Sequence, residues 1–177
     1  MSVQVVVLNG GSSSGKARIT RCLKAIQPTP WISLGVDDLL DTLPPSLTDV
    51  DAGVTFGQQG QLTLEQGFRE LEEAGLTGIA AMARAGARIF VGRVFLGGVT
   101  SQERVRQHLE GLEVLWVGAR CDPAVAAGRE LARGSRVIGM AVSQATVVHE
   151  GVDYDVEVDT TATEALDCAR VIAAYLD

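Results

Sequence analysis

The sequence is poor in basic residues and in long apolar runs, and each shortage excludes a class of protein. Fifteen Lys and Arg stand against 22 Asp and Glu, which gives a formal net charge of −7. An acidic chain without a basic tract suits neither nucleic acid nor an anionic membrane surface, so neither partner is expected. No apolar run approaches the roughly 20 residues of a membrane helix. The first four residues also lack the basic start of a secretory signal.

Cysteine and histidine are scarce as well. The three cysteines form no CxxC pair and there are only two histidines, so neither a disulfide framework nor a structural zinc site is expected. We therefore expect a reduced, cytoplasmic protein. Apolar residues, by contrast, make up 46% of the 177 residues, and glycine is abundant at 20. This length and composition predict one domain, residues 1–177, with a proper core.

Short apolar runs alternate with helical patterns along the chain. Five β-branched or apolar runs, separated by helices, predict a parallel sheet covered on both faces, which is a three-layer α/β fold. The predicted strands are residues 3–8, 31–36, 88–95, 113–121 and 154–158. The predicted helices are 16–26, 37–42, 64–85, 101–109, 123–133, 137–150 and 163–176. The apolar side of the helix at 64–85 is predicted to be Phe68, Leu71, Leu76, Ile79 and Met82.

The first predicted strand runs into a glycine-rich segment that ends in a lysine. Gly10, Gly15 and Lys16 match the phosphate-loop spacing G-x-x-x-x-G-K, with a buried strand before and a helix after. Backbone N–H groups of such a loop cradle phosphates, and the lysine reaches the β- and γ-phosphates. The alternative is a simple Gly/Ser turn. The predicted nucleotide-binding residues are Gly10, Gly11, Ser12, Ser13, Ser14, Gly15, Lys16 and Ala17.

Beyond this loop, the sequence resembles the chloramphenicol phosphotransferases over almost its full length. The segments that carry the resemblance are LNGGSSSGKA (8–17), LGVDDLL (34–40), AMARAGARIF (81–90), VFLGG (94–98), LWVGARCD (115–122), GRELARGSRVIGMA (128–141) and VVHEGVDYDVEVDTT (147–161). The resemblance implies a P-loop kinase fold with strand order 2-3-1-4-5. It also implies transfer of the ATP γ-phosphate to a primary hydroxyl of an antibiotic such as chloramphenicol. An acceptor-side excursion is expected at about 44–63 and a lid at about 122–140.

The acceptor side is expected to follow the second predicted strand. Asp37 lies directly at the carboxyl end of that strand, after residue 36, and a carboxylate there could orient an acceptor hydroxyl and accept its proton. The resemblance places the catalytic base at Asp37; the alternative is that Asp37 only caps the next helix. Candidates for an apolar acceptor wall are Val54, Phe56, Phe68 and Met82, although such residues at helical spacing are more often core.

Four arginines lie at the end of the fourth predicted strand and in the residues after it. Guanidinium groups stabilise phosphoryl oxygens, so Arg120, Arg129, Arg133 and Arg136 could close over the phosphates. By resemblance Arg133 and Arg136 are the better catalytic candidates, with Arg129 on the nucleotide. The alternative is a solvated helix face.

The loop after the last predicted strand completes the nucleotide site in this interpretation. Thr160 and Thr161 are expected beside the adenine of ATP, and one hydroxyl among residues 160–163 is expected to cap the closing helix. No residue pairs with His149 or His108 in a hydrolase pattern, and His108 is expected on the surface.

Two positions depart from the resemblance and concern Mg²⁺. Ala17 stands where a metal-binding hydroxyl is usual, and Gly92-Arg93 stands where the resemblance implies acidic residues. Three explanations remain open: a kinase whose Mg²⁺ is held by other groups, a kinase for a different alcohol whose charge Arg93 contacts, or a degenerate nucleotide-binding module. Arg93 could also simply extend into solvent. The expected partners are a nucleotide and a small-molecule alcohol; the sequence leaves ATP against GTP, and self-association into a homo-oligomer, open.

Overall fold

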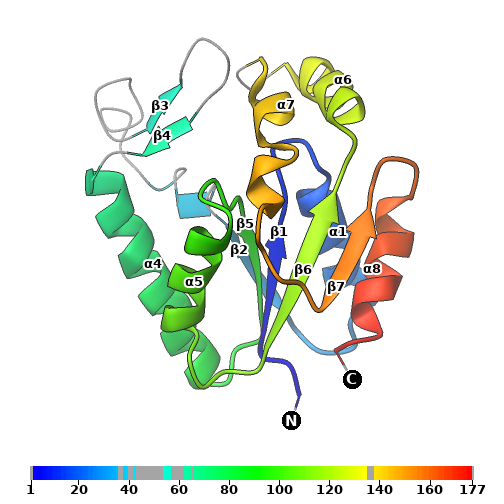
Figure 1. Ribbon diagram of the computed structural model, residues 1–177. Helices are drawn as coiled ribbons and strands as arrows, with labels where there is room; N and C mark the ends of the chain where they lie inside the picture. The colour runs from blue at the N-terminus through cyan, green and yellow to red at the C-terminus, as the bar shows by residue number, and fades with distance from the viewer. Residues whose placement is uncertain are drawn as a thin grey trace.

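Five parallel strands form the centre of the molecule, with helices on both faces (Figure 1). This computed structural model describes residues 2–35, 38–39, 42, 54–56, 62–64, 66–134 and 138–176. The strands are β1 (Val5–Asn9), β2 (Ile32–Gly35), β5 (Ile89–Arg93), β6 (Val114–Arg120) and β7 (Val156–Asp159). They lie in the order β2-β5-β1-β6-β7, and every neighbouring pair is parallel. The predicted fold class and strand order are therefore confirmed.

The central strand is apolar throughout because both of its faces are covered. All five residues of β1 are buried. Val6 and Leu8 face the layer that holds α1 (Lys16–Ile26) and α8 (Ala165–Ala173). Val5 and Val7 face the layer that holds α4 (Gln66–Arg84) and α5 (Val99–His108). A strand buried on two faces must read as a continuous apolar run, as the sequence does here.

The remaining elements lie at the carboxyl ends of the strands (Figure 1). They are α6 (Pro123–Arg133), α7 (Met140–Gln144), the short 3₁₀ helix η1 (Val147–His149) and an antiparallel pair, β3 (Val54–Phe56) with β4 (Leu62–Leu64). The helices at 16–26 and 123–133 occur at their predicted bounds. Within the described residues, no helix is both long enough and apolar enough to cross a membrane.

Three predictions about elements are corrected. The helix expected at 137–150 is two short pieces, and the first begins after Gly139, which has a left-handed φ of 93°. The excursion expected at about 44–63 holds β3 and the first two residues of β4, which replaces the predicted helix start at Leu64. In α4 the buried stripe is Glu72, Leu76, Ile79, Ala80 and Ala83, whereas Leu71 and Met82 are exposed because they lie beside that stripe.

Candidate active site

The phosphate loop lies between the end of β1 and the start of α1, at the carboxyl edge of the sheet. The Gly10 N–H donates to the carbonyl of Arg93, at 3.3 Å, which fixes the start of the loop to the end of β5. A Cβ on Gly10 would lie 2.5 Å from the carbonyl oxygen of Ala119, so no side chain fits there. The loop passes Ser13 in a left-handed conformation and ends at Gly15, the N-cap of α1. This path is the one that the spacing predicts.

Donor groups gather on the inside of this loop. The Lys16 Nζ lies over its start, donating to the carbonyls of Gly10 at 2.5 Å and Gly11 at 2.8 Å. The hydroxyls of Ser12 and Ser13 are buried and have no hydrogen-bond partner among the described residues. The first turn of α1 carries no acidic residue that would neutralise its N–H groups. Buried donors without acceptors are costly, and phosphate oxygens would supply the acceptors, so the loop fits a nucleotide.

Thr160 joins the phosphate loop to α6. Its hydroxyl donates to the carbonyl of Ser14 at 2.7 Å, and its residue is buried. Arg129 donates from Nη1 to that hydroxyl at 3.1 Å, and from Nη2 to the Thr160 carbonyl at 2.6 Å. The guanidinium of Arg129 is thus engaged in bracing the loop after β7. Its predicted contact with nucleotide stays a prediction.

An open hollow of about 350 Å³ lies beside this brace, at the ends of β6 and β7. Thr161, predicted to lie by the adenine, is among its lining residues, with Asp122, Pro123, Thr146 and Asp159. The Thr161 N–H donates to Asp159 at 2.7 Å, and the hydrogen bonds from Thr161 hold the pKa of the Asp159 carboxyl below its usual value. That Thr160 and Thr161 lie beside the adenine stays a prediction.

Two expectations near this hollow are corrected. α8 has Glu164 as its N-cap and no side-chain cap, because the Thr161 hydroxyl instead accepts from the Asp122 N–H at 2.9 Å. Arg120 does not lean over the phosphates; it is exposed and pairs with Glu157 of the neighbouring strand.

The segment from α6 to α7 contains a buried carboxylate that sequence reasoning missed. Glu130 of α6 is 2% exposed and accepts from the N–H groups of Gly139 and Ala141, both at 2.8 Å. It thereby ties α6 to the start of α7. Arg133 lies one turn further along α6, exposed to solvent, and Arg136 lies outside the described residues. No local pattern in the sequence marks this contact, because it joins residues 9 and 11 positions apart.

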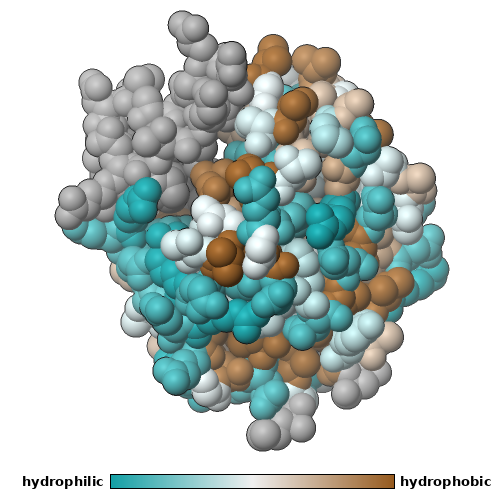
Figure 2. All heavy atoms as spheres, viewed as in Figure 1, coloured by the Kyte–Doolittle hydropathy of each residue, from teal (hydrophilic) through white to brown (hydrophobic). Residues whose placement is uncertain are grey.

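In the segment from α6 to α7, several apolar side chains are exposed while two polar ones are buried. Figure 2 shows hydrophobic surface over the end of the molecule that carries α6 and α7. The exposed apolar side chains there are Leu131 at 63%, Ile138 at 70% and Val142 at 51%. Polar Glu130 and Gln144 are buried instead. These buried polar groups accept from backbone N–H groups, Glu130 from α7 and its N-cap and Gln144 from Ser12.

Most of the predicted acceptor side lies beyond the part of the chain that the structure describes. Asp37 lies outside the described residues. Val54, Phe56 and Phe68 lie in β3 and α4, but their side chains are not among those described. Met82 is a correction: its carbonyl accepts from the Ala87 N–H just before β5 begins. It therefore lies at the amino end of the sheet, opposite the phosphate loop, and cannot form an acceptor wall.

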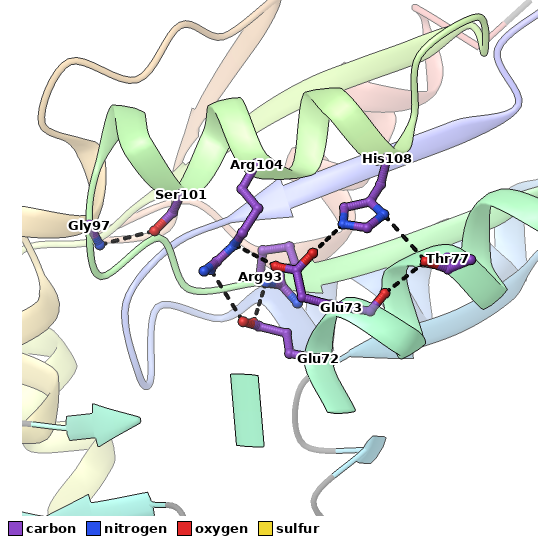
Figure 3. A network of polar contacts seen from close by, with 8 residues as sticks. All are labelled: Glu72, Glu73, Thr77, Arg93, Gly97, Ser101, Arg104 and His108. Carbon is purple, nitrogen blue, oxygen red and sulfur yellow. Dashed lines mark hydrogen bonds and ion pairs between the residues drawn. The ribbon is translucent and has the colours of Figure 1, made fainter. Parts of the chain in front are cut away.

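Arg93 belongs to a buried network of charges between β5, α4 and α5 (Figure 3). The guanidinium is buried and pairs with Glu72, whose other oxygen accepts from Arg104 at 3.2 Å. Glu73 pairs in turn with Arg104, at 3.3 Å, and with His108. Burial lowers the pKa of the Arg93 guanidinium, and Glu72 opposes that shift. The expectation that Arg93 extends into solvent is wrong, because Glu72 neutralises it inside the protein.

The described residues do not fit a metal ion held by the protein. Ala17 and Gly92 offer no side-chain oxygen, and Arg93 brings a cation. Within the described part of the chain, no three carboxylate, histidine or cysteine side chains lie close enough to bind a metal together.

A second buried polar cluster, not foreseen from the sequence, holds the end of β1 behind the loop. Asn9 donates from Nδ2 to the Val148 carbonyl and to the Tyr154 hydroxyl, both at 2.6 Å, and accepts from the Phe95 N–H at 2.9 Å. The Tyr154 hydroxyl lies 2.6 Å from His149 Nδ1. Burial raises the pKa of Tyr154 to about 12 and lowers that of His149 to about 4. At neutral pH tyrosine donates and neutral histidine accepts.

Comparisons with known proteins agree with this geometry. The chain is 28% identical, over 94% of its length and 79% of the relative's, to a protein of Mycobacterium tuberculosis H37Rv named a candidate O-phosphotransferase. A sugar kinase from Janibacter sp. HTCC2649 shares the fold with a TM-score of 0.71 at 17% identity, covering 99% of this chain and 95% of that one. The APS kinase of M. tuberculosis, crystallised with AMPPNP and APS, shares it with a TM-score of 0.64 at 13% identity, covering 99% and 98%.

A family model settles the assignment. The model described as "Chloramphenicol phosphotransferase-like protein" matches residues 3–177. The chain belongs to the chloramphenicol phosphotransferase-like family, and with it to the small-molecule kinases.

Proposed function

We propose that this protein transfers the γ-phosphate of ATP to the primary hydroxyl of a small-molecule alcohol, and that chloramphenicol is such an acceptor. The observation that carries the proposal is the set of buried, unsatisfied donors at the phosphate loop: the Ser12 and Ser13 hydroxyls beside Lys16. A site that presents several donors inward and holds a lysine over them is suited to phosphate oxygens. The solved APS kinase of the same fold was crystallised with an ATP analogue, which supports ATP as the donor.

In this proposal the loop holds the donor and does not react. The Lys16 ammonium leaves the loop carbonyls and donates to phosphate oxygens, while the loop N–H groups hold the phosphate chain. Arg133 and Arg136 of the lid neutralise negative charge that develops on the transferred group. The acceptor oxygen forms a bond to the γ-phosphorus as the bond to the β-γ bridging oxygen breaks, and ADP leaves.

Asp37 is proposed as the base that accepts the proton of the acceptor hydroxyl. Asp37→Asn removes the charge and keeps the shape. We expect turnover to fall at least about 100-fold, while the dissociation constant for ATP stays within about threefold because the phosphate loop is unchanged. Asp38→Asn, at the exposed neighbouring position, is the matched control and should leave both quantities unchanged. Full turnover in Asp37→Asn would remove Asp37 from the mechanism.

The acceptor is tested directly by product mass. Incubation with ATP, Mg²⁺ and chloramphenicol should give a product heavier by one phosphoryl group, together with ADP. Parallel incubations with a panel of other primary alcohols test whether a different acceptor is used. Product from another alcohol alone would keep the kinase activity and overturn chloramphenicol as acceptor.

A second candidate function is a nucleotide-binding module without efficient transfer. Ala17 and Gly92 favour it, because both positions lack the oxygen that would support a metal ion. Nucleotide binding with no phosphorylated product across the whole alcohol panel would favour the module over the kinase. GTP, tested beside ATP in the same binding assay, resolves the donor base.

A further inference from the structure

A glutamine of α7 lies directly against the phosphate loop. The Ser12 N–H donates to the side-chain oxygen Oε1 of Gln144 at 2.8 Å, although the two residues are 132 positions apart. Gln144 is 4% exposed and ends α7. Because a backbone N–H can only donate, the oxygen of this carboxamide must face Ser12, and the amino group Nε2 must point elsewhere.

The position of Gln144 is fixed from two sides. A Cβ on Gly11 would lie 3.2 Å from the Gln144 backbone and Cβ, so a glycine lets α7 approach the loop this closely. At its other end α7 is held by Glu130, which accepts from the N–H groups of Gly139 and Ala141. The side chain is therefore a fixed part of the loop's wall rather than a surface residue that happens to touch it.

The amino end of Gln144 has no hydrogen-bond partner among the described residues, while its oxygen is engaged. The hydroxyls of Ser12 and Ser13 are likewise buried without acceptors. Within the described chain, two buried hydroxyls at the start of the loop thus lack acceptors, and the Gln144 amino group lacks one without being fully enclosed. Buried donors without acceptors are unfavourable, and an amino group that is not enclosed is free to meet a ligand, so this grouping points to an anion that supplies oxygens to all three.

The position of Lys16 indicates which part of that ligand lies here. A phosphate-loop lysine reaches the β- and γ-phosphates, and here its Nζ lies on the carbonyls of Gly10 and Gly11. The start of the loop is therefore the side of the terminal phosphate. We propose that Gln144 binds the γ-phosphate of the donor nucleotide through Nε2 while its Oε1 holds the Ser12 N–H. This inference rests on the proposed function, since it assumes ATP as the ligand.

Gln144→Glu separates the two ends of the side chain. The glutamate keeps the length and an oxygen for the Ser12 N–H, but it loses the donor and adds a negative charge toward the phosphate. We expect the affinity for AMPPNP to fall about tenfold or more. We expect the affinity for ADP to change less than about threefold, because ADP lacks the γ-phosphate. Isothermal titration calorimetry at fixed Mg²⁺ measures both, and Gln107→Glu on exposed α5 controls for the added charge.

Gln144→Met, which removes both polar ends without adding charge, decides the matter if the glutamate variant does not fold. It should also lose its preference for AMPPNP over ADP, with a lower melting temperature because the Ser12 N–H loses its acceptor. If both variants lose affinity for AMPPNP and ADP equally, the ratio of the two affinities is unchanged. Gln144 would then only brace the loop, and the inference would be overturned. A wild-type protein that binds neither nucleotide would instead refute the proposed function.

Discussion

The buried Arg93 of β5 requires a buried carboxylate on the neighbouring helix α4. β5 places the Arg93 guanidinium in the interior, where an isolated charge is strongly unfavourable. α4 meets it with Glu72 at the start of its buried stripe, and α5 adds Arg104 on the other carboxylate oxygen. The charge brought by Arg93 is thus balanced locally and does not face the nucleotide as an open cation. This arrangement gives no support to Arg93 as a receptor for an anionic acceptor.

Removing one partner of this buried pair should destabilise the fold. Glu72→Gln leaves Arg93 and Arg104 facing a neutral amide, and we expect the free energy of unfolding to fall by about 3–5 kcal/mol. Asp167→Asn, which breaks the exposed pair with Arg170, is the control and should cost about 0–1 kcal/mol. Urea unfolding followed by circular dichroism measures both. Similar small losses in the two variants would show that the network contributes little.

Gly92 and Arg93 point to opposite faces of the sheet. Phe90 packs in the layer of α1, whereas Ile89 and Val91 pack in the layer of α4 and α5. Because strand side chains alternate, a side chain at position 92 would face the layer of α1, which begins beside Ala17. A Cβ on Gly92 would meet only the Gly35 Cα, at 3.9 Å, so there is room for one. Gly92, rather than Arg93, is therefore the position where an acid could support Mg²⁺ beside the loop.

Restoring side-chain oxygens on the face of the sheet toward α1 should make ATP binding depend more strongly on Mg²⁺. We expect Ala17→Ser combined with Gly92→Asp to bind ATP more tightly with Mg²⁺ than without it, by a larger ratio than the wild type shows. Ala17→Ser combined with Arg93→Asp is the contrast: it sets a second carboxylate against Glu72 and should lower the melting temperature without that gain. Titration calorimetry with and without Mg²⁺ measures the ratio. A larger gain from the Arg93 combination would reverse our assignment of the two positions.

At the scale of elements, the Glu130 carboxylate joins α6 to the start of α7. Glu130→Gln replaces the acceptor of two N–H groups with a neutral amide that offers only one oxygen. We expect the local stability of α7 to fall by about 1–3 kcal/mol. Hydrogen exchange followed by mass spectrometry should then show faster exchange for 138–145 and unchanged exchange for β1. Glu103→Gln on the exposed face of α5 is the control. Unchanged protection of α7 would mean that its packing on Gly11 suffices.

Local signals in the sequence predict the elements whose ends are locally determined. α6 begins at Asp122, whose side chain accepts from two N–H groups, continues through Pro123 and ends at Gly134 in a left-handed conformation. Each of these features is legible in the sequence. The single helix predicted at 137–150 is wrong because Gly139 interrupts it and Glu130, nine residues earlier, holds the start of α7.

In the candidate site too, locally determined features are predicted and features that depend on distant residues are not. The phosphate loop has a local spacing, and the sequence therefore predicts it. Asn9, Gln144 and Glu72 act through partners 139, 132 and 21 residues away, so no local pattern marks them. A polar residue at a buried position is the only trace that such contacts leave in a single sequence. The structure supplies the partner that explains it.

Across the whole molecule, buried polar groups concentrate at the carboxyl edge of the sheet. Asn9, Ser12, Ser14, His149 and Thr160 are all buried there, while the strands below them are apolar. The hydrogen bonds of Asn9 join β1, the turn after β5 and the segment from η1 to Tyr154 into one support behind the loop. His149 belongs to this support, so its protonation affects the stability of this edge of the sheet.

The pH dependence of folding should carry the signature of His149. Its folded pKa is about 4, below the ordinary 6.5, because burial disfavours the charged form. Between pH 6.5 and 4 the unfolded chain therefore binds a proton that the folded protein does not, so stability is full above pH 6.5 and falls as the pH is lowered. His149→Gln keeps a neutral acceptor for the Tyr154 hydroxyl and cannot titrate. Thermal unfolding from about pH 7.5 to about pH 4 should show a shallower loss in the variant, since the carboxylates contribute equally to both proteins. Parallel curves for the two proteins would show that His149 is already protonated, or exposed, in the folded state.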